Sequence, residues 1–140
     1  MTQLQVSSLK SGYGSVQIVN DVSFDIKQGE IVAVIGRNGV GKTTLIKTII
    51  GALPTTSGSI SYKGRDITKL GAAARARLGI GYVPQGRGIF TRMTVAANLG
   101  LGSGVGNAAV PDLKRAFSFF PILEKRLSQL AGSMSGGEQQ

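Results

Sequence analysis

Residues 36–43 hold the residue pattern in this chain that is most closely tied to a particular chemistry. They fit G-x-x-x-x-G-K-[ST], with Lys42 and Thr43 at the last two positions. Small residues let such a loop wrap a phosphate chain, and its N–H groups and the following helix N-terminus attract that anion. The lysine reaches the β- and γ-phosphates, and the hydroxyl binds Mg²⁺. The pattern predicts a nucleoside triphosphate site made by Gly36, Asn38, Gly39, Gly41, Lys42, Thr43 and Thr44.

The elements on either side of this motif are the ones that must position it. Residues 31–35 form an unbroken apolar run with a β-branched bias, which predicts a strand buried on both faces. Residues 44–50 place apolar side chains at helical spacing, and Gly51 and Pro54 then supply a stop. A chain with 21 glycines could contain the motif by chance. Because the pattern predicts a strand before the motif and a helix after it, the phosphate site is the better interpretation.

Composition limits the kind of protein this can be. A length of 140 residues, 41% of them hydrophobic, suits one domain with a sizeable core. The chain has no cysteine, which excludes disulfides and thiolate metal sites within it. Residues 93–111 carry no charged side chain, but glycine, asparagine and proline interrupt them, so they predict a helix start and a flexible glycine loop instead of a membrane span.

The formal charge of +9 raises the question of an anionic partner, either nucleic acid or a membrane. The lysines and arginines are spread along the chain as singles and pairs, and no basic run interleaved with aromatic residues is present. A solvated basic surface is therefore the favoured interpretation, and we expect no nucleic-acid partner.

Hydrophobic patterns predict the other elements and a division of the chain. Two short strands are expected at residues 4–9 and 22–27, a half-exposed antiparallel strand at 59–63, and a second buried strand at 80–83. Helices are expected at residues 68–78, 113–120 and 121–130. Because the pattern changes to helices and loops after Pro84, residues 1–84 predict a nucleotide-binding core and residues 85–140 a helical subdomain.

A second group of residues lies near the end of the chain, at Ser135, Gly136 and Gly137. By itself this triplet would be a turn. Downstream of the phosphate loop, and with Gln85 between them, it resembles the signature motif of ABC ATPases. The resemblance covers the whole chain. It implies an α/β fold with a P-loop NTPase (ABC ATPase) core, an antiparallel β portion and a partial helical subdomain, truncated before the Walker B strand.

The resemblance also implies roles for single residues. Tyr13 matches the aromatic residue that stacks on adenine, although a tyrosine between two glycines can also be an ordinary turn residue. Gln85 matches the glutamine that senses Mg²⁺ and the γ-phosphate, against the alternative of a surface loop. The family pattern thus makes Lys42 and Gln85 the catalytic candidates and Thr43 and Gln85 the Mg²⁺ ligands. The triplet beginning at Ser135 would close over ATP held by a second subunit.

Within this family, residues 82–90 and 93–99 are similar to the ATP-binding subunits of branched-chain amino-acid importers. Importers of urea and short-chain amides have nearly the same sequences in these two segments, and they remain the alternative. The resemblance implies an ATP-hydrolysing subunit that pairs with a second ATPase subunit and docks on membrane permease subunits. Contact with a substrate-binding protein would be indirect. The expected location is the cytoplasmic face of the membrane, as a peripheral subunit.

The family's hydrolysis uses residues that this sequence does not show. None of the seven carboxylates follows four consecutive apolar residues, as the Asp-Glu pair of the family does, and the chain has no histidine. We therefore expect an N-terminal fragment that is marginally stable and does not turn over ATP. Two alternatives are a nucleotide-binding module without catalysis and a soluble ABC protein that acts on DNA or the ribosome.

Overall fold

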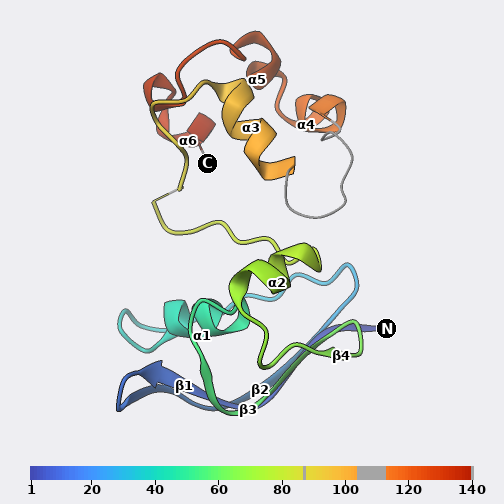
Figure 1. The fold of residues 1–140 in the computed structure, drawn as a ribbon, viewed down its shortest axis with the longest axis vertical. Helices are drawn as coiled ribbons and strands as arrows, with labels where there is room; N and C mark the ends of the chain where they lie inside the picture. The colour runs from blue at the N-terminus through green and yellow to red at the C-terminus, as the bar shows by residue number, and fades with distance from the viewer. Residues whose placement is uncertain (87, 104–112, 140) are drawn as a thin grey trace. The chain divides into compact units, whose positions relative to one another are not determined.

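The structure is a computed structural model that describes residues 1–86, 88–103 and 113–139. The chain forms two compact units, residues 1–80 and residues 81–140 (Figure 1). For residues 93–111 the sequence predicts a helix start followed by a glycine loop; the helix is α3 (Val95–Ser103), and residues 104–111 lie outside the described residues.

A four-stranded antiparallel sheet, in the order β2-β1-β3-β4, forms the base of the first unit. β1 (Thr2–Tyr13) and β2 (Val16–Lys27) make a hairpin. β3 (Thr55–Tyr62) pairs with the other side of β1, and the short β4 (Arg65–Asp66) pairs with β3. The three strands predicted at 4–9, 22–27 and 59–63 are confirmed. All are longer than predicted, because pairing with a neighbour extends a strand past the residues that show clear alternation.

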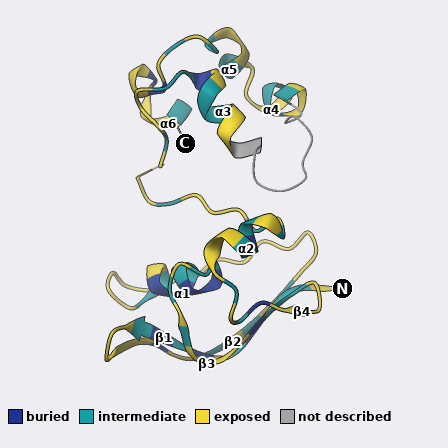
Figure 2. Ribbon diagram, in the orientation of Figure 1, coloured by how far each residue is buried: buried dark blue, intermediate teal, exposed yellow. Residues whose placement is uncertain are grey.

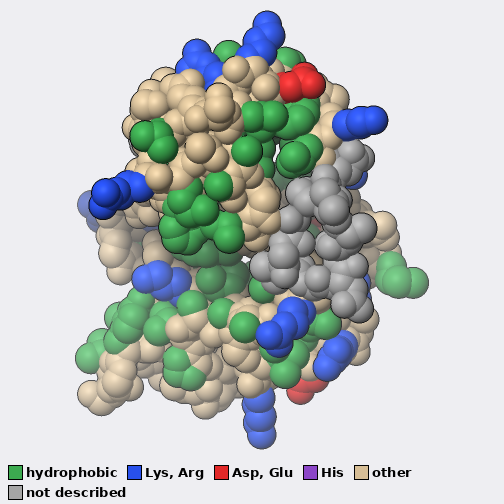
Figure 3. All heavy atoms as spheres, turned by 45° about the horizontal axis from the view of Figure 1, so that its top comes forward, with side chains coloured by type: hydrophobic (Ala, Val, Ile, Leu, Met, Phe, Trp, Pro, Cys, Tyr) green, Lys and Arg blue, Asp and Glu red, His purple; other side chains and the backbone are tan. Residues whose placement is uncertain are grey.

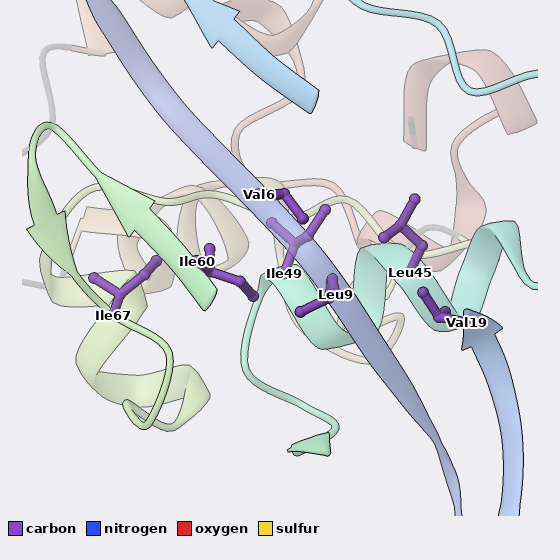
Figure 4. Packing of buried hydrophobic residues seen from close by; sticks show 7 residues of the cluster. All are labelled: Val6, Leu9, Val19, Leu45, Ile49, Ile60 and Ile67. Atoms are coloured by element: carbon purple, nitrogen blue, oxygen red, sulfur yellow. The ribbon is translucent and has the colours of Figure 1, made fainter. Parts of the chain in front are cut away.

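The hydrophobic core of this unit lies between the sheet and the helix that follows the phosphate loop. α1 (Lys42–Ile49) carries Leu45 and Ile49 one turn apart on its buried face, so the predicted helix is confirmed and begins two residues earlier. α2 (Ala72–Arg77) occupies part of the helix predicted at 68–78. Figure 4 shows the seven buried side chains of the core: Val6, Leu9, Val19, Leu45, Ile49, Ile60 and Ile67.

The two buried strands predicted at residues 31–35 and 80–83 are not formed. Both segments are irregular, and Ile31 and Ile35 are 96% and 92% exposed. Figure 2 shows the segment between β2 and α1 as exposed. A strand needs a neighbour to satisfy its N–H and C=O groups, and in the described part of the chain neither segment pairs with one. Their composition suits a buried strand, but pairing decides whether one forms.

The second unit consists of short helices. Besides α3 these are α4 (Leu113–Phe119), α5 (Pro121–Lys125), the 3₁₀ helix η1 (Ala131–Ser133) and α6 (Gly136–Gln139). The helix predicted at 113–120 is confirmed, but the one predicted at 121–130 ends at Lys125. The reason is tertiary: the carbonyls of Leu127 and Gln129 accept hydrogen bonds from the N–H groups of Ala96 and Val95, at 3.0 and 2.9 Å.

The distribution of basic side chains and the character of the helices are the two features of the described residues that matter for a nucleic-acid or membrane partner. On the face drawn in Figure 3, lysine and arginine side chains are scattered and form no single patch. Among the described residues, no helix combines the length and the apolar character that crossing a membrane requires.

The buried position of Leu9 gives a direct test of the core. Leu9 is fully buried, so Leu9→Ala should lower the free energy of unfolding by about 2–5 kcal/mol. Val16, at the hairpin end of β2, is largely exposed, and Val16→Ala should change it by less than about 0.5 kcal/mol. Urea denaturation followed by circular dichroism measures both. Equal effects of the two substitutions would contradict the core assignment.

Candidate functional site

The phosphate-loop motif leads directly into α1, and Gly41 makes the junction. Its backbone has φ 100° and ψ 7°, a left-handed conformation that glycine adopts without strain. A Cβ at this position would lie 2.9 Å from Cγ2 of Ile18 on β2, so the loop also packs closely against the hairpin. The first helical hydrogen bond runs from Leu45 N–H to Gly41 C=O at 2.8 Å. The N–H groups of the residues between them therefore lie in the first turn, where an external acceptor can be bound.

The electrostatics of this helix start favour an anion. The first turn of α1 contains no acidic residue, and no side chain caps it. The helix dipole adds a partial positive charge there. The ammonium of Lys42 lies over the loop, where Nζ donates hydrogen bonds to the carbonyls of Gly36 and Arg37 at 2.6 and 2.7 Å. A flexible cation is thus held beside a positively polarised helix end.

The remaining predicted loop residues divide into exposed and buried positions. Asn38, Gly39 and Thr43 are exposed, so the Thr43 hydroxyl is accessible to a ligand. Thr44 is buried and faces inward. Its carbonyl accepts a hydrogen bond from Thr48 Oγ1 at 2.8 Å, which ties the first turn of the helix to the second.

Tyr13 lies at the hairpin end of β1, opposite Val16. Its side chain is 48% exposed, and a core role does not account for it. The same end of the hairpin carries Ile18, whose side chain leaves no room for a Cβ at Gly41. Figure 1 shows this hairpin end and the loop before α1 on the same side of the first unit. The structure therefore brings an exposed aromatic side chain and the phosphate loop to one region.

Gln85 and the signature triplet belong to the second unit. Gln85 is exposed in an irregular segment after Pro84. Ser135 precedes α6, and Gly136 and Gly137 are the first residues of that helix. The structure thus places the predicted site residues in two groups, one in each unit.

Ser135 and Glu138 form a reciprocal cap at the start of α6. Ser135 N–H donates to Glu138 Oε2 at 2.8 Å, and Glu138 N–H donates to Ser135 Oγ at 3.4 Å. Arg126 Nη1 lies 3.3 Å from the same carboxylate. The hydrogen bonds from Ser135 hold the pKa of Glu138 below its ordinary value, and the charge of Arg126 lowers this pKa further. The serine that the family pattern assigns to phosphate is therefore oriented by its own helix.

Sequence reasoning missed the residues that hold these elements in place. Glu138 had a signal, because Ser135 and Glu138 have the spacing of a capping box. Ser11 is fully buried, donates to Pro54 C=O at 2.8 Å and lies 2.7 Å from Thr48 Oγ1. Arg75 is 1% exposed. No sequence pattern distinguishes it from Arg77, two residues later in the same helix, which is exposed.

Comparison with known proteins places this site in a family. Residues 19–140 match the ABC transporter family, and the chain belongs to it. It is 40% identical to the high-affinity branched-chain amino acid transport ATP-binding protein BraG of Pseudomonas aeruginosa, over 98% of this chain and 60% of that protein. Identity with the lipopolysaccharide export system ATP-binding protein LptB of Escherichia coli K12 is 42%, over 71% of this chain and 41% of LptB.

Solved structures agree with this assignment. A nucleotide-free ATP-binding cassette from an ABC transporter superposes with a TM-score of 0.80 at 26% identity, covering 99% of this chain and 61% of the other. The ADP conformation of MJ1267, an ATP-binding cassette of an ABC transporter, also gives 0.80, at 28% identity and with the same coverage. The chain spans about three fifths of the length of these relatives and of BraG.

The cap at α6 predicts a pH dependence. A carboxylate whose pKa is lowered in the folded state stabilises it above the unfolded pKa, about 4.5 for glutamate, and this stabilisation is lost as the pH falls through the lowered value. Glu138→Gln should therefore lower the melting temperature at pH 7, and the difference from wild type should shrink at pH 3. Glu124→Gln, at an exposed position of α5, is the control. Equal melting of wild type and Glu138→Gln at pH 7 would contradict the role of the cap.

Proposed function

We propose that this chain is the ATP-binding part of an ABC transporter subunit, and that its phosphate loop binds the triphosphate of Mg-ATP. The observation that carries the proposal is the loop itself, which enters α1 at a left-handed glycine with an uncapped helix start and Lys42 beside it. When ATP binds, Lys42 Nζ would donate to phosphate oxygens in place of the carbonyls of Gly36 and Arg37. The helix start supplies N–H donors to the same phosphates.

The residues present also suit magnesium and adenine. Mg²⁺ bound with a nucleotide takes only one or two protein ligands besides phosphate oxygens and water. Thr43 is the candidate ligand in the first unit, and Gln85 is the candidate in the second. Among the described residues, no group of three His, Cys, Asp or Glu side chains could hold a metal ion. Tyr13 would stack on the adenine ring.

The two parts of the chain would have different functions. Residues 1–84 would hold the nucleotide, and residues 85–140 would carry the groups that respond to it and to a partner. The triplet at Ser135 would close on ATP held by a second ATPase subunit. In the parent subunit, hydrolysis of the bound ATP would supply the free energy for opening this dimer, and Lys42 and Gln85 would contribute to that reaction at the γ-phosphate. The present chain by itself is expected to bind ATP without turning it over.

The identity with BraG supports a branched-chain amino-acid importer as the parent system, as does 40% identity with LivF of Archaeoglobus fulgidus over 98% of this chain. The subunit would then dock on permease subunits at the cytoplasmic face of the membrane and meet the substrate-binding protein only indirectly. An export system is the second candidate, because LptB is 42% identical over a shorter stretch. The longer matches favour import.

Nucleotide binding is tested by calorimetric titration of the purified chain with Mg-ATP. Lys42→Ala removes a charged donor, an interaction of about 1.5–3 kcal/mol, so binding should weaken roughly ten- to hundredfold. Lys47→Ala makes the same charge change in the last turn of α1 and should leave the affinity nearly unchanged. If Lys42→Ala binds as tightly as wild type, the phosphate loop is not the site.

The transported solute is tested in the organism that makes the protein. A chromosomal Lys42→Ala substitution should abolish most uptake of radiolabelled leucine or isoleucine if the subunit powers their import, because ATP binding drives the cycle. Lys47→Ala is again the control. Unchanged leucine and isoleucine uptake in the Lys42→Ala strain would overturn the branched-chain assignment.

A further inference from the structure

Arg75 is a buried arginine that no predicted role accounts for. It lies in α2, is 1% exposed, and donates four hydrogen bonds to backbone carbonyls. Two go from Nη1 to the carbonyls of Thr48 and Ile49, at 2.9 and 2.7 Å. The others go from Nε to Leu70 C=O at 2.7 Å and from Nη2 to Thr68 C=O at 2.8 Å. The guanidinium thus joins the end of α1 to the turn before α2.

Two of the four acceptor carbonyls lie at the C-terminal end of α1. Thr48 and Ile49 are the last residues but one and the last of α1, where helix carbonyls have no partner within the helix. A cation at this end also interacts favourably with the helix dipole. The next turn is packed tightly, since a Cβ on Gly51 would lie 3.0 Å from Arg75 Nε. A planar guanidinium supplies several donors in a fixed geometry that a lysine cannot reproduce.

We propose that Arg75 is a positioning residue for the nucleotide site, which it serves by holding the C-terminal end of α1 in place. The helix has eight residues and is therefore a rod about 12 Å long, so a shift at one end also moves the other. Lys42 and Thr43 lie at that other end. This inference rests on the proposed function, because it concerns the binding of Mg-ATP by the same loop.

A second anchor limits how α1 can move. Thr48 Oγ1 lies 2.7 Å from Ser11 Oγ on β1, and this contact holds the last turn of α1 against the sheet. Arg75 connects the same turn to a different part of the chain, residues 68–75, through its hydrogen bonds to Thr48 C=O and Thr68 C=O. With both contacts in place, the start of α1 is fixed before a nucleotide arrives. Such preorganisation lowers the cost of binding.

The direct test compares Arg75→Lys with Arg77→Lys, which makes the same change at an exposed site of the same helix. Mg-ATP affinity is measured by calorimetry at a temperature where circular dichroism shows each variant folded. Because small misplacements of binding groups have large effects, Arg75→Lys should bind at least about tenfold more weakly, while Arg77→Lys binds as wild type does. A purely structural role would lower the melting temperature of Arg75→Lys and leave the affinity of its folded form unchanged, and that result overturns the proposal.

A measurement on the wild-type chain keeps the proposal testable if Arg75→Lys does not fold. The N–H groups of Leu78 and Ile80 donate to Arg75 C=O at 3.1 and 3.3 Å, and neither residue belongs to the phosphate loop. Saturating Mg-ATP should slow hydrogen exchange at these two amides by more than the general slowing that ligand binding causes across the first unit, if Arg75 couples α2 to α1. If ATP binds and the exchange at these two amides does not change beyond that general slowing, the positioning role of Arg75 is overturned while the proposed nucleotide site stands. Failure of wild type to bind Mg-ATP at all would overturn the proposed function and this inference with it.

Discussion

The first unit depends on the burial of one face of α1 against the antiparallel sheet. Leu45 and Ile49 of the helix belong to one buried cluster with side chains from three strands, and each such side chain gains about 1.5–3 kcal/mol when fully buried. This gain has to offset the conformational entropy lost when the chain is ordered. Because the phosphate loop enters the helix at Gly41, where the side chain of Ile18 leaves no room for a Cβ, the packing that stabilises the unit also determines where the loop lies.

The two ends of α1 differ in charge and accessibility, and the difference corresponds to their proposed roles. The N-terminal end is uncapped and has Lys42 beside it, so its N–H groups can serve an anion. The C-terminal end is closed by Arg75, which binds the carbonyls of Thr48 and Ile49. Burial lowers the pKa of Arg75 from its ordinary value, and the nearby Asp66 partly opposes this effect. An arginine remains charged in such a site, so the contact persists at physiological pH.

In the second unit, side-chain hydrogen bonds order the turn that carries Ser135. Ser135 and Glu138 cap α6 from both directions, and Arg126 holds the carboxylate. Gln139 Nε2 adds hydrogen bonds to carbonyls in the turn before the helix, among them Met134 C=O at 2.9 Å. The signature triplet is therefore presented on a well-connected turn.

Patterns that depend on neighbours in sequence could be predicted from the residues alone. The helix after the loop motif, three of the four strands of the sheet and the start of the helix at Pro121 all follow from spacing within a few residues, whereas the short β4 has no such pattern. The capping box formed by Ser135 and Glu138 has the same local character, since its two residues are three positions apart. In each of these cases the residues that form the structure are close together in the chain.

Tertiary structure decided what depends on distant partners. Residues 31–35 and 80–83 have the composition of buried strands, yet a strand also needs a neighbour for its hydrogen bonds, and composition does not supply one. The helix at Pro121 ends early because the carbonyls of Leu127 and Gln129 bind the segment before α3. Arg75 and Arg77 are the same residue type two positions apart, and only packing shows that one closes the helix and the other faces solvent. The sequence by itself therefore determined the loop motif and the helix after it, whereas folding decided whether the segment before the loop forms a strand and which side chains hold the helix in position.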